Sequence, residues 1–152
     1  MAEPEKTEQA LYSERVVPNL GTFVAVFVLL PSTVIIAEPF NVWVGFVVGV
    51  LGVGSIWALL IFRAPRIIVS RTEIRVGSVS ISKKLIGEAR VILKDEIFAE
   101  RGPNLDPAAF KVFQGTVKTA IKIPINDPDD PTPYWLVSTR NPVELAAALK
   151  RL

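Results

Sequence analysis

Two long apolar segments, residues 16–37 and 42–62, constrain this chain more than any other feature of its sequence. Neither segment contains a charged side chain, and four residues, 38–41, separate them. At about 1.5 Å per residue, a helix of about 20 residues crosses a hydrocarbon core of about 30 Å. The sequence therefore predicts a transmembrane helical hairpin over residues 16–62, preceded by a short tail over residues 1–15.

Basic residues indicate how the hairpin is oriented. Arg15 precedes the first segment, Arg63 and Arg66 follow the second, and the connector has no Lys or Arg. Because Lys and Arg collect on the cytoplasmic side of membrane helices, we expect a multi-pass protein with both termini in the cytoplasm. The acidic residues before Arg15 and the length of the first segment argue against a cleavable signal peptide.

Small residues recur at helical spacing in both apolar segments and favour close packing of the two helices. They are Gly21, Ala25 and Ser32 in the first segment and Gly45, Gly49 and Gly52 in the second. Folding the chain at the connector predicts Ser32 opposite Gly45 or Gly49, and Ala25 opposite Gly52. An alternative use of the spacing between Gly45 and Gly49 is a homodimer.

Residues 63–152 have the pattern of one small water-soluble α+β domain, mainly antiparallel β with a C-terminal helix. Apolar residues alternate with polar ones in short segments that predict strands: residues 66–70, 73–76, 79–81, 86–93, 117–125 and 134–138. Pro124 predicts an edge position for the fifth of these. Asp106 and Pro107 predict a short helix through Phe113, and Asn141 and Pro142 open the terminal helix.

The composition removes most familiar enzyme chemistry. The chain contains no cysteine and no histidine, so thiolate nucleophiles, disulfides, thiolate metal sites and imidazole bases are excluded. Asp127, Asp129 and Asp130 lie close together, but their spacing lacks the glycine and distal glutamate of a calcium loop, and the prolines between them favour a turn. We therefore expect no enzyme activity, no cofactor and no bound metal.

A basic stretch after the hairpin is the first candidate binding site. Its residues are Arg63, Arg66, Arg71, Arg75, Lys83 and Lys84. Near an anionic inner leaflet, such residues attract lipid headgroups. The alternative is that these charges set the membrane topology and keep strand faces in water. Nucleic acid is not an expected partner, because these basic residues are not accompanied by a motif of aromatic side chains that could stack on nucleobases.

A second candidate is an aromatic and cationic ligand cleft formed by Tyr134, Trp135 and Arg140. The alternative is that the two neighbouring rings point to opposite faces of a strand, one into the core and one to the surface.

The order of short antiparallel strands followed by one amphipathic helix resembles the pleckstrin-homology-like fold. The whole chain also resembles an actinobacterial two-helix membrane family, domain of unknown function 3093. The residues that carry this resemblance are Tyr12–Arg15, the string at residues 127–140, and residues 142–149. The resemblance implies a plasma-membrane protein and supplies no activity or catalytic residues.

Together these features predict a non-enzymatic integral membrane protein. Its hairpin would tether a pleckstrin-homology-like domain, residues 63–152, that binds a protein partner or anionic lipid headgroups at the cytoplasmic face. The alternatives are an accessory subunit of a larger cell-envelope complex and an enzyme with an unrecognised site.

Overall fold

The computed structural model describes residues 10–151, which form two compact units. The hairpin unit is Val17–Ala64, and the sheet unit is made from both flanking segments, up to Val16 and from Pro65 onward. The segment before the hairpin was predicted to be a separate tail, but from Tyr12 it forms a strand of the sheet unit. The predicted tail's residues 1–9 lie outside the described residues.

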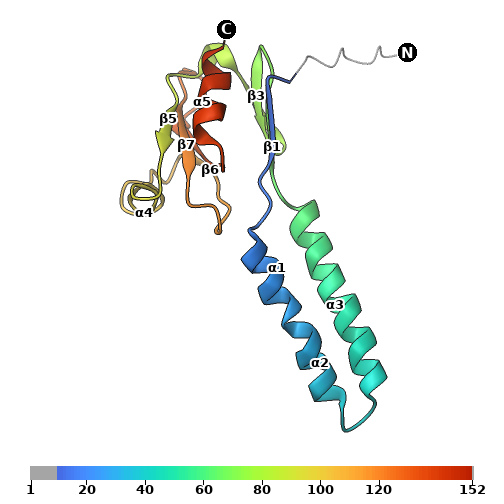
Figure 1. Ribbon diagram of the computed structural model, residues 1–152. Helices are drawn as coiled ribbons and strands as arrows, with labels where there is room; N and C mark the ends of the chain where they lie inside the picture. The colour runs from blue at the N-terminus through green and yellow to red at the C-terminus, as the bar shows by residue number, and fades with distance from the viewer. Residues whose placement is uncertain (1–9, 152) are drawn as a thin grey trace, which may run out of the picture. The chain divides into compact units, whose positions relative to one another are not determined.

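The hairpin unit has two helical arms (Figure 1). They contain α1 (Leu20–Phe27), α2 (Leu29–Ala37) and α3 (Val42–Phe62). Asn19 caps α1 by accepting a hydrogen bond from the backbone N–H of Thr22 at 3.0 Å, and Asn41 caps α3 in the same way from Trp43 at 2.9 Å. Both arms are long and apolar enough to cross a membrane. Neither α1 nor α2 has a buried residue.

The first arm is interrupted at Val28, between α1 and α2. Pro31, three residues after this point, has no N–H to donate, and its ring crowds the carbonyl of the residue four positions earlier, Phe27. The Ser32 hydroxyl donates to the Val28 carbonyl at 2.9 Å, and the Thr33 hydroxyl donates to the Leu30 carbonyl at 2.8 Å. These side chains supply hydrogen bonds to backbone carbonyls around the break.

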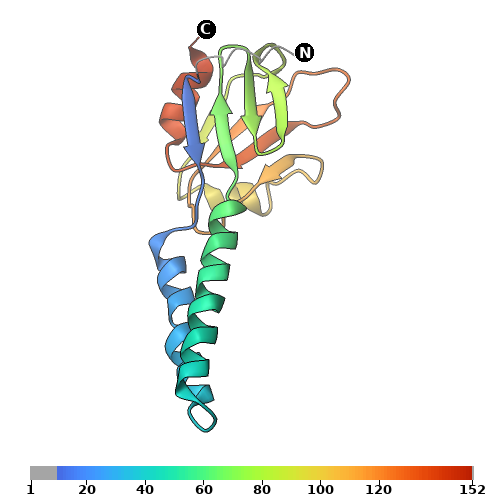
Figure 2. The same ribbon diagram turned by 90° about the vertical axis from the view of Figure 1, so that its right-hand side faces the viewer.

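Eight strands in the sheet unit form two four-stranded sheets (Figure 2). Sheet 1 is an antiparallel meander of β1 (Tyr12–Arg15), β2 (Arg66–Val69), β3 (Glu73–Val76) and β4 (Val79–Ser82). Sheet 2 has the order β5 (Arg90–Ile92), β7 (Ala120–Pro124), β8 (Tyr134–Ser138) and β6 (Phe110–Val112). A turn at Gly77, whose φ of 62° suits glycine, joins β3 to β4.

Three short helices complete the sheet unit: the 3₁₀ helix η1 (Lys83–Leu85), α4 (Ile97–Arg101) and α5 (Pro142–Lys150). The terminal helix α5 contacts β1 and β2 of sheet 1 and β5 and β7 of sheet 2. It therefore covers one opening between the sheets (Figure 1).

The main core of the sheet unit lies between the inward faces of the two sheets and α5. Its fully buried members include Ile67, Val76, Ile121, Val137 and Leu145. A second cluster of Ile92, Ile97, Ala120 and Leu136 packs on the opposite face of sheet 2. Sheet 2 is consequently buried on both faces, which explains the continuous apolar run in β8.

Two sequence predictions for sheet 2 are wrong. The strand that contains Pro124 is central, between β5 and β8, and Pro124 is tolerated because it is the last residue of the ladder. The helix predicted from Asp106 is a turn followed by β6, which pairs in parallel with β8. Asp106 uses its carboxylate to accept from the Ala108 N–H at 2.8 Å, an Asx turn that needs no helix.

Candidate binding surfaces

Gly45 and Gly49 face the first arm of the hairpin. A Cβ atom on Gly45 would lie 2.6 Å from the Ala37 Cβ and 2.7 Å from the Thr33 carbonyl oxygen. A Cβ on Gly49 would collide with the Thr33 hydroxyl and lie 3.3 Å from the Leu30 carbonyl oxygen. This close approach of α2 and α3 occupies the glycine face on which the alternative homodimer would depend.

The other small residues take different positions from those predicted. Thr33 and Ala37, rather than Ser32, lie against Gly45, and a Cβ on Gly52 would meet nothing within 4 Å. Gly21 and Ala25 are exposed. The residues of the first arm that were predicted to lie against α3 are therefore not the ones that make the close contact.

An aromatic cluster joins the two arms of the hairpin at the end where the chain enters and leaves it. The Trp57 indole N–H donates to the Phe23 carbonyl at 3.3 Å. The Trp57 ring lies 6.0 Å from the Phe23 ring in an edge-to-face arrangement and 6.4 Å from the Phe27 ring. Trp57 therefore connects α3 to α1 as well as having the amphipathic character of an interfacial side chain.

The predicted basic stretch does not form one patch in the structure. Arg66 begins β2, whereas Arg71 lies in the turn beyond the other end of β2. Lys84 follows β4, whose last residue Ser82 pairs with the beginning of β3, so it lies near that same far end. Arg75 is on the outward face of β3 and pairs with Glu73 at 3.1 Å. Arg63 belongs to the hairpin unit, as the C-cap of α3.

Lys83 is buried rather than exposed to headgroups. Its ammonium donates to the carbonyl of Ala148 in the last turn of α5 at 3.1 Å, and burial lowers its pKa. A cation at this place complements the negative end of the helix dipole. Lys83 also lines an open groove of about 390 Å³, whose other residues include Glu88 and Lys150, ion-paired at 2.7 Å. We assign Lys83 a capping role.

Glu14 connects the strand before the hairpin to the loop between β8 and α5. Its carboxylate accepts hydrogen bonds from the Tyr12 hydroxyl at 2.6 Å, from the Thr139 hydroxyl, and from the Arg140 backbone N–H at 3.0 Å. Burial, together with the hydrogen bond to Glu14, raises the pKa of Tyr12 to about 12. Thr139 is fully buried, and its hydroxyl also accepts from the Asn141 N–H at 3.1 Å.

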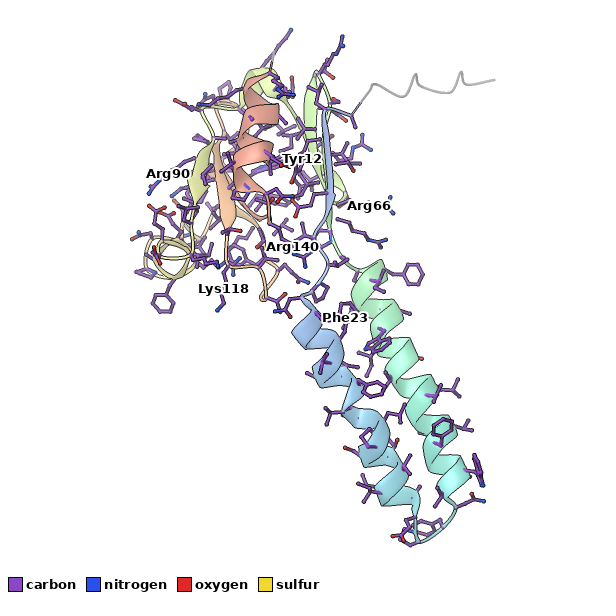
Figure 3. All side chains as sticks on the ribbon, viewed as in Figure 1. Tyr12, Phe23, Arg66, Arg90, Lys118 and Arg140 are labelled. Carbon is purple, nitrogen blue, oxygen red and sulfur yellow. The ribbon has the colours of Figure 1, made fainter. Side chains whose placement is uncertain are left out.

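Tyr134, Trp135 and Arg140 do not line a common cleft. Trp135 is 3 % exposed and packs in the main core, with its ring 4.8 Å from that of Phe110. Tyr134 points to the other face, where its ring lies 4.2 Å from the Lys122 ammonium. Its hydroxyl accepts from the Asp106 N–H at 2.7 Å, fixing the loop before β6. Arg140 lies beyond the end of β8, and Figure 3 labels it below Tyr12.

The outer face of sheet 2 carries a buried ion pair that the sequence analysis missed. Glu100 is 5 % exposed, and its carboxylate lies 2.8 Å from the Lys122 ammonium and 3.8 Å from the Arg90 guanidinium. Arg90 also pairs with Glu96. Glu100 is in α4 and Lys122 is in β7, so no local sequence pattern indicates that they form a pair. With its charges satisfied, it fixes α4 against β5 and β7.

Arg101, next to Glu100, makes a separate polar contact. Its guanidinium donates to the Val117 carbonyl and to the Ser138 hydroxyl, both at 2.8 Å, and lies 5.1 Å from the Phe113 ring centroid. Burial lowers the pKa of Arg101. These bonds hold the loop before β7 against the end of β8.

The acidic turn at residues 126–130 is held by its own backbone. Asp127 accepts from the Asp129 N–H at 3.0 Å, and Asp130 accepts from the Thr132 N–H at 2.9 Å. Hydrogen bonds from Thr132 lower the pKa of Asp130. These are Asx turns. Across residues 10–151, the structure contains no group of three acidic side chains arranged to hold a metal ion.

A family model described as protein of unknown function (DUF3093) matches residues 11–149. The chain belongs to this family. No curated protein and no solved structure matches it. The DUF3093 match includes both Tyr12–Arg15 and the loop after β8, so the Glu14 hydrogen bonds join the beginning of the family region to its last quarter.

Proposed function

We propose that this chain is an integral protein of the plasma membrane whose sheet unit is a non-enzymatic interaction module at the cytoplasmic face. The ligand would be a protein partner or anionic lipid headgroups. The exposed apolar side chains of the hairpin support the membrane placement, since α1 and α2 bury none of theirs and α3 buries Gly45, Gly49 and Val53. A soluble protein rarely exposes so large an apolar surface.

The pairing of β1 with β2 is the observation that carries this proposal. β1 ends five residues before α1, β2 begins four residues after α3, and their residues pair in register from Tyr12 with Val69 to Arg15 with Arg66. Two strands of one sheet lie in the same compartment. If the two arms cross the membrane, the hairpin must therefore enter and leave on one side.

The fold supports an interaction module of pleckstrin-homology-like type. Sheet 1 is a four-strand meander, β5, β7 and β8 form an antiparallel second sheet, and α5 closes one opening between them. β6, parallel to β8, is an addition to that pattern. Lys83 and Arg101, whose pKa values are lowered by burial, each donate a hydrogen bond to a backbone carbonyl of the protein, and this structural use of the two cations favours a binding role over catalysis.

An accessory role in a larger membrane complex is the second candidate. Gly52 and Gly54 have nothing within 4 Å of the position a Cβ would take, so this part of α3 is open to another helix. Gly45 and Gly49 offer no such opening, because the hairpin's own first arm covers them.

Single-cysteine labelling tests the topology, because the natural chain has no cysteine to interfere. Glu38→Cys places a thiol in the connector, and Ser80→Cys places one on the exposed face of β4. In intact cells a membrane-impermeant maleimide is expected to label the connector alone, and Ser80→Cys is expected to react only after permeabilisation. Labelling of both thiols from the same side, or release of the protein by alkaline carbonate, would refute the proposed hairpin.

A further inference from the structure

We propose that three exposed bases at one end of the sheet unit bind the phosphate groups of anionic phospholipids. These bases, which we call the hairpin-side rim, are Arg66, Lys118 and Arg140. The inference rests on the proposed membrane placement and names the ligand of the sheet unit. The three residues of the rim are far apart in the sequence, and the tertiary structure brings them to one end of the sheet unit.

Covalent connection keeps Arg66 near the end of the hairpin. It lies four residues after Phe62, the last residue of α3, and an extended chain spans at most about 3.5 Å per residue. Arg66 is therefore within about 14 Å of the end of α3. Arg15, its register partner on β1, lies five residues before α1. This end of the sheet unit cannot move far from the leaflet that the hairpin enters.

Hydrogen bonds bring the other two bases to the same end. The Arg140 backbone N–H donates to Glu14, which is the residue before Arg15 on β1. The Thr139 N–H donates to the Thr119 carbonyl at 3.3 Å, and the Thr119 hydroxyl donates back to the Thr139 carbonyl, so Lys118 lies next to this loop. Figure 3 labels Arg66, Arg140 and Lys118 in the lower part of the sheet unit, with Tyr12 and Arg90 above them.

The charges of Arg66 and Lys118 are not used for ion pairs in the described part of the sheet unit. Arg75, Arg90, Lys122 and Lys150 each pair with a glutamate. In the described part of the chain, neither Arg66 nor Lys118 has a carboxylate within ion-pair distance, and both side chains are exposed. Glu14, the nearby acid on β1, directs its carboxylate to Tyr12 and Thr139.

Phosphate is the ligand chemistry that fits this rim. Guanidinium groups bind phosphate oxygens with paired hydrogen bonds, and an ammonium adds a point charge. The three bases come from separate segments, the start of β2, the loop before β7 and the loop after β8, so they are spread over one end of the unit. A lipid leaflet presents many phosphates in one plane, and the hairpin holds that plane within reach.

The test uses the full chain in lipid nanodiscs, with a fluorophore on Ser78→Cys in the turn between β3 and β4. This turn is at the hairpin-side end, because Gly77 donates its N–H to the Arg66 carbonyl at 2.8 Å. Quenching by a headgroup spin-labelled lipid is compared in discs of phosphatidylcholine alone and of phosphatidylcholine with phosphatidylglycerol. The rim variant is R66Q/K118Q/R140Q. The matched control R71Q/R75Q/K84Q removes the same charge away from the rim.

Phosphatidylglycerol should increase quenching both in the protein with the natural rim residues and in the R71Q/R75Q/K84Q control variant. In the rim variant, the ratio of contacting to free sheet units should fall by roughly fivefold per base, or about 100-fold in all. Equal quenching in both lipids, or equal loss in rim and control variants, would overturn the inference. So would a rim variant that keeps its lipid response but loses a cross-linked acidic protein in native membranes. Failure of the chain to enter nanodiscs would instead overturn the membrane placement itself.

Discussion

The hairpin unit and the sheet unit use apolar residues in opposite ways. In the sheet unit, side chains such as Ile67 and Leu136 are fully buried, whereas in the hairpin Leu51 is 65 % exposed and Trp43 is 76 % exposed. The sheet unit is folded by removal of apolar surface from water. The hairpin is held by close helix contact at Gly45 and Gly49 and has its apolar surface outward, as expected of a structure whose solvent is lipid.

Truncating a leucine in each unit should give the largest contrast. Leu136→Ala removes a fully buried side chain from sheet 2 and is expected to lower the free energy of unfolding by about 2–5 kcal/mol. Leu51→Ala, the matched change on an exposed face of α3, should have an effect below about 0.5 kcal/mol in detergent or lipid. Denaturant unfolding of the two purified variants measures both. Equal destabilisation would show that the exposed face of α3 is covered by protein.

Enlarging glycines should reveal the packing of the hairpin. Gly49→Val forces side-chain atoms against Thr33 and the Leu30 backbone and is expected to cost about 1–3 kcal/mol of hairpin stability. Gly52→Val, which faces open space, is the control and should be neutral or slightly stabilising. The separation of the arms can be followed by the fluorescence of Trp57, whose ring lies near Phe23 and Phe27 across the hairpin. Both variants are made with Trp43→Phe and Trp135→Phe, so that the emission comes from Trp57. If Gly52→Val were the more damaging change, a different face of α3 would make the contact.

Local patterns were sufficient for the elements that depend on local physics. The bounds of α3, β3 and β8 follow directly from an apolar run and from short β-favouring segments, and they match the predicted ranges. The helix predicted from Asp106 was wrong because a tertiary contact, from its N–H to the Tyr134 hydroxyl, and pairing of β6 with β8 outweigh the local cap signal. Local propensity is a weak prior when long-range pairing competes.

The candidate sites depend even more on contacts between distant residues. Glu14 and Thr139 are 125 positions apart, and nothing in either segment indicates that they share hydrogen bonds. Lys83 and Lys84 are neighbours in sequence, yet one caps α5 from the interior and the other is exposed. The basic stretch predicted from sequence therefore combined residues that lie at opposite ends of sheet 1. It also left out Lys118 and Arg140, which lie at the same end of the sheet unit as Arg66.

Removal of the Glu14 carboxylate should weaken the contact between β1, which precedes the hairpin, and the loop between β8 and α5. Glu14→Ala leaves the buried Thr139 hydroxyl and the Arg140 N–H without their acceptor and is expected to cost about 1–3 kcal/mol. Glu88→Ala removes an exposed ion pair with Lys150 and should change the free energy of unfolding much less than Glu14→Ala does. Hydrogen exchange of β1 amides would report the loss locally. Unchanged protection of β1 in Glu14→Ala would mean that the ladder with β2 alone holds this strand.

The smallest expected effect is a pH dependence centred on Tyr12. Its pKa is about 12 in the folded chain and about 10 in an unfolded one, so the neutral phenol is the form that folding favours. Its contribution to stability is therefore complete below pH 10 and is lost as the pH rises from about 10 to about 12. Lysines also lose their charge in this range, so the informative quantity is the difference between the natural chain and Tyr12→Phe, which cannot ionise at this position. The thermal unfolding midpoint of the natural chain should fall more steeply over that range than that of Tyr12→Phe. Parallel curves for the two proteins would show that the phenol is solvated in the folded state and that Glu14 does not restrain it.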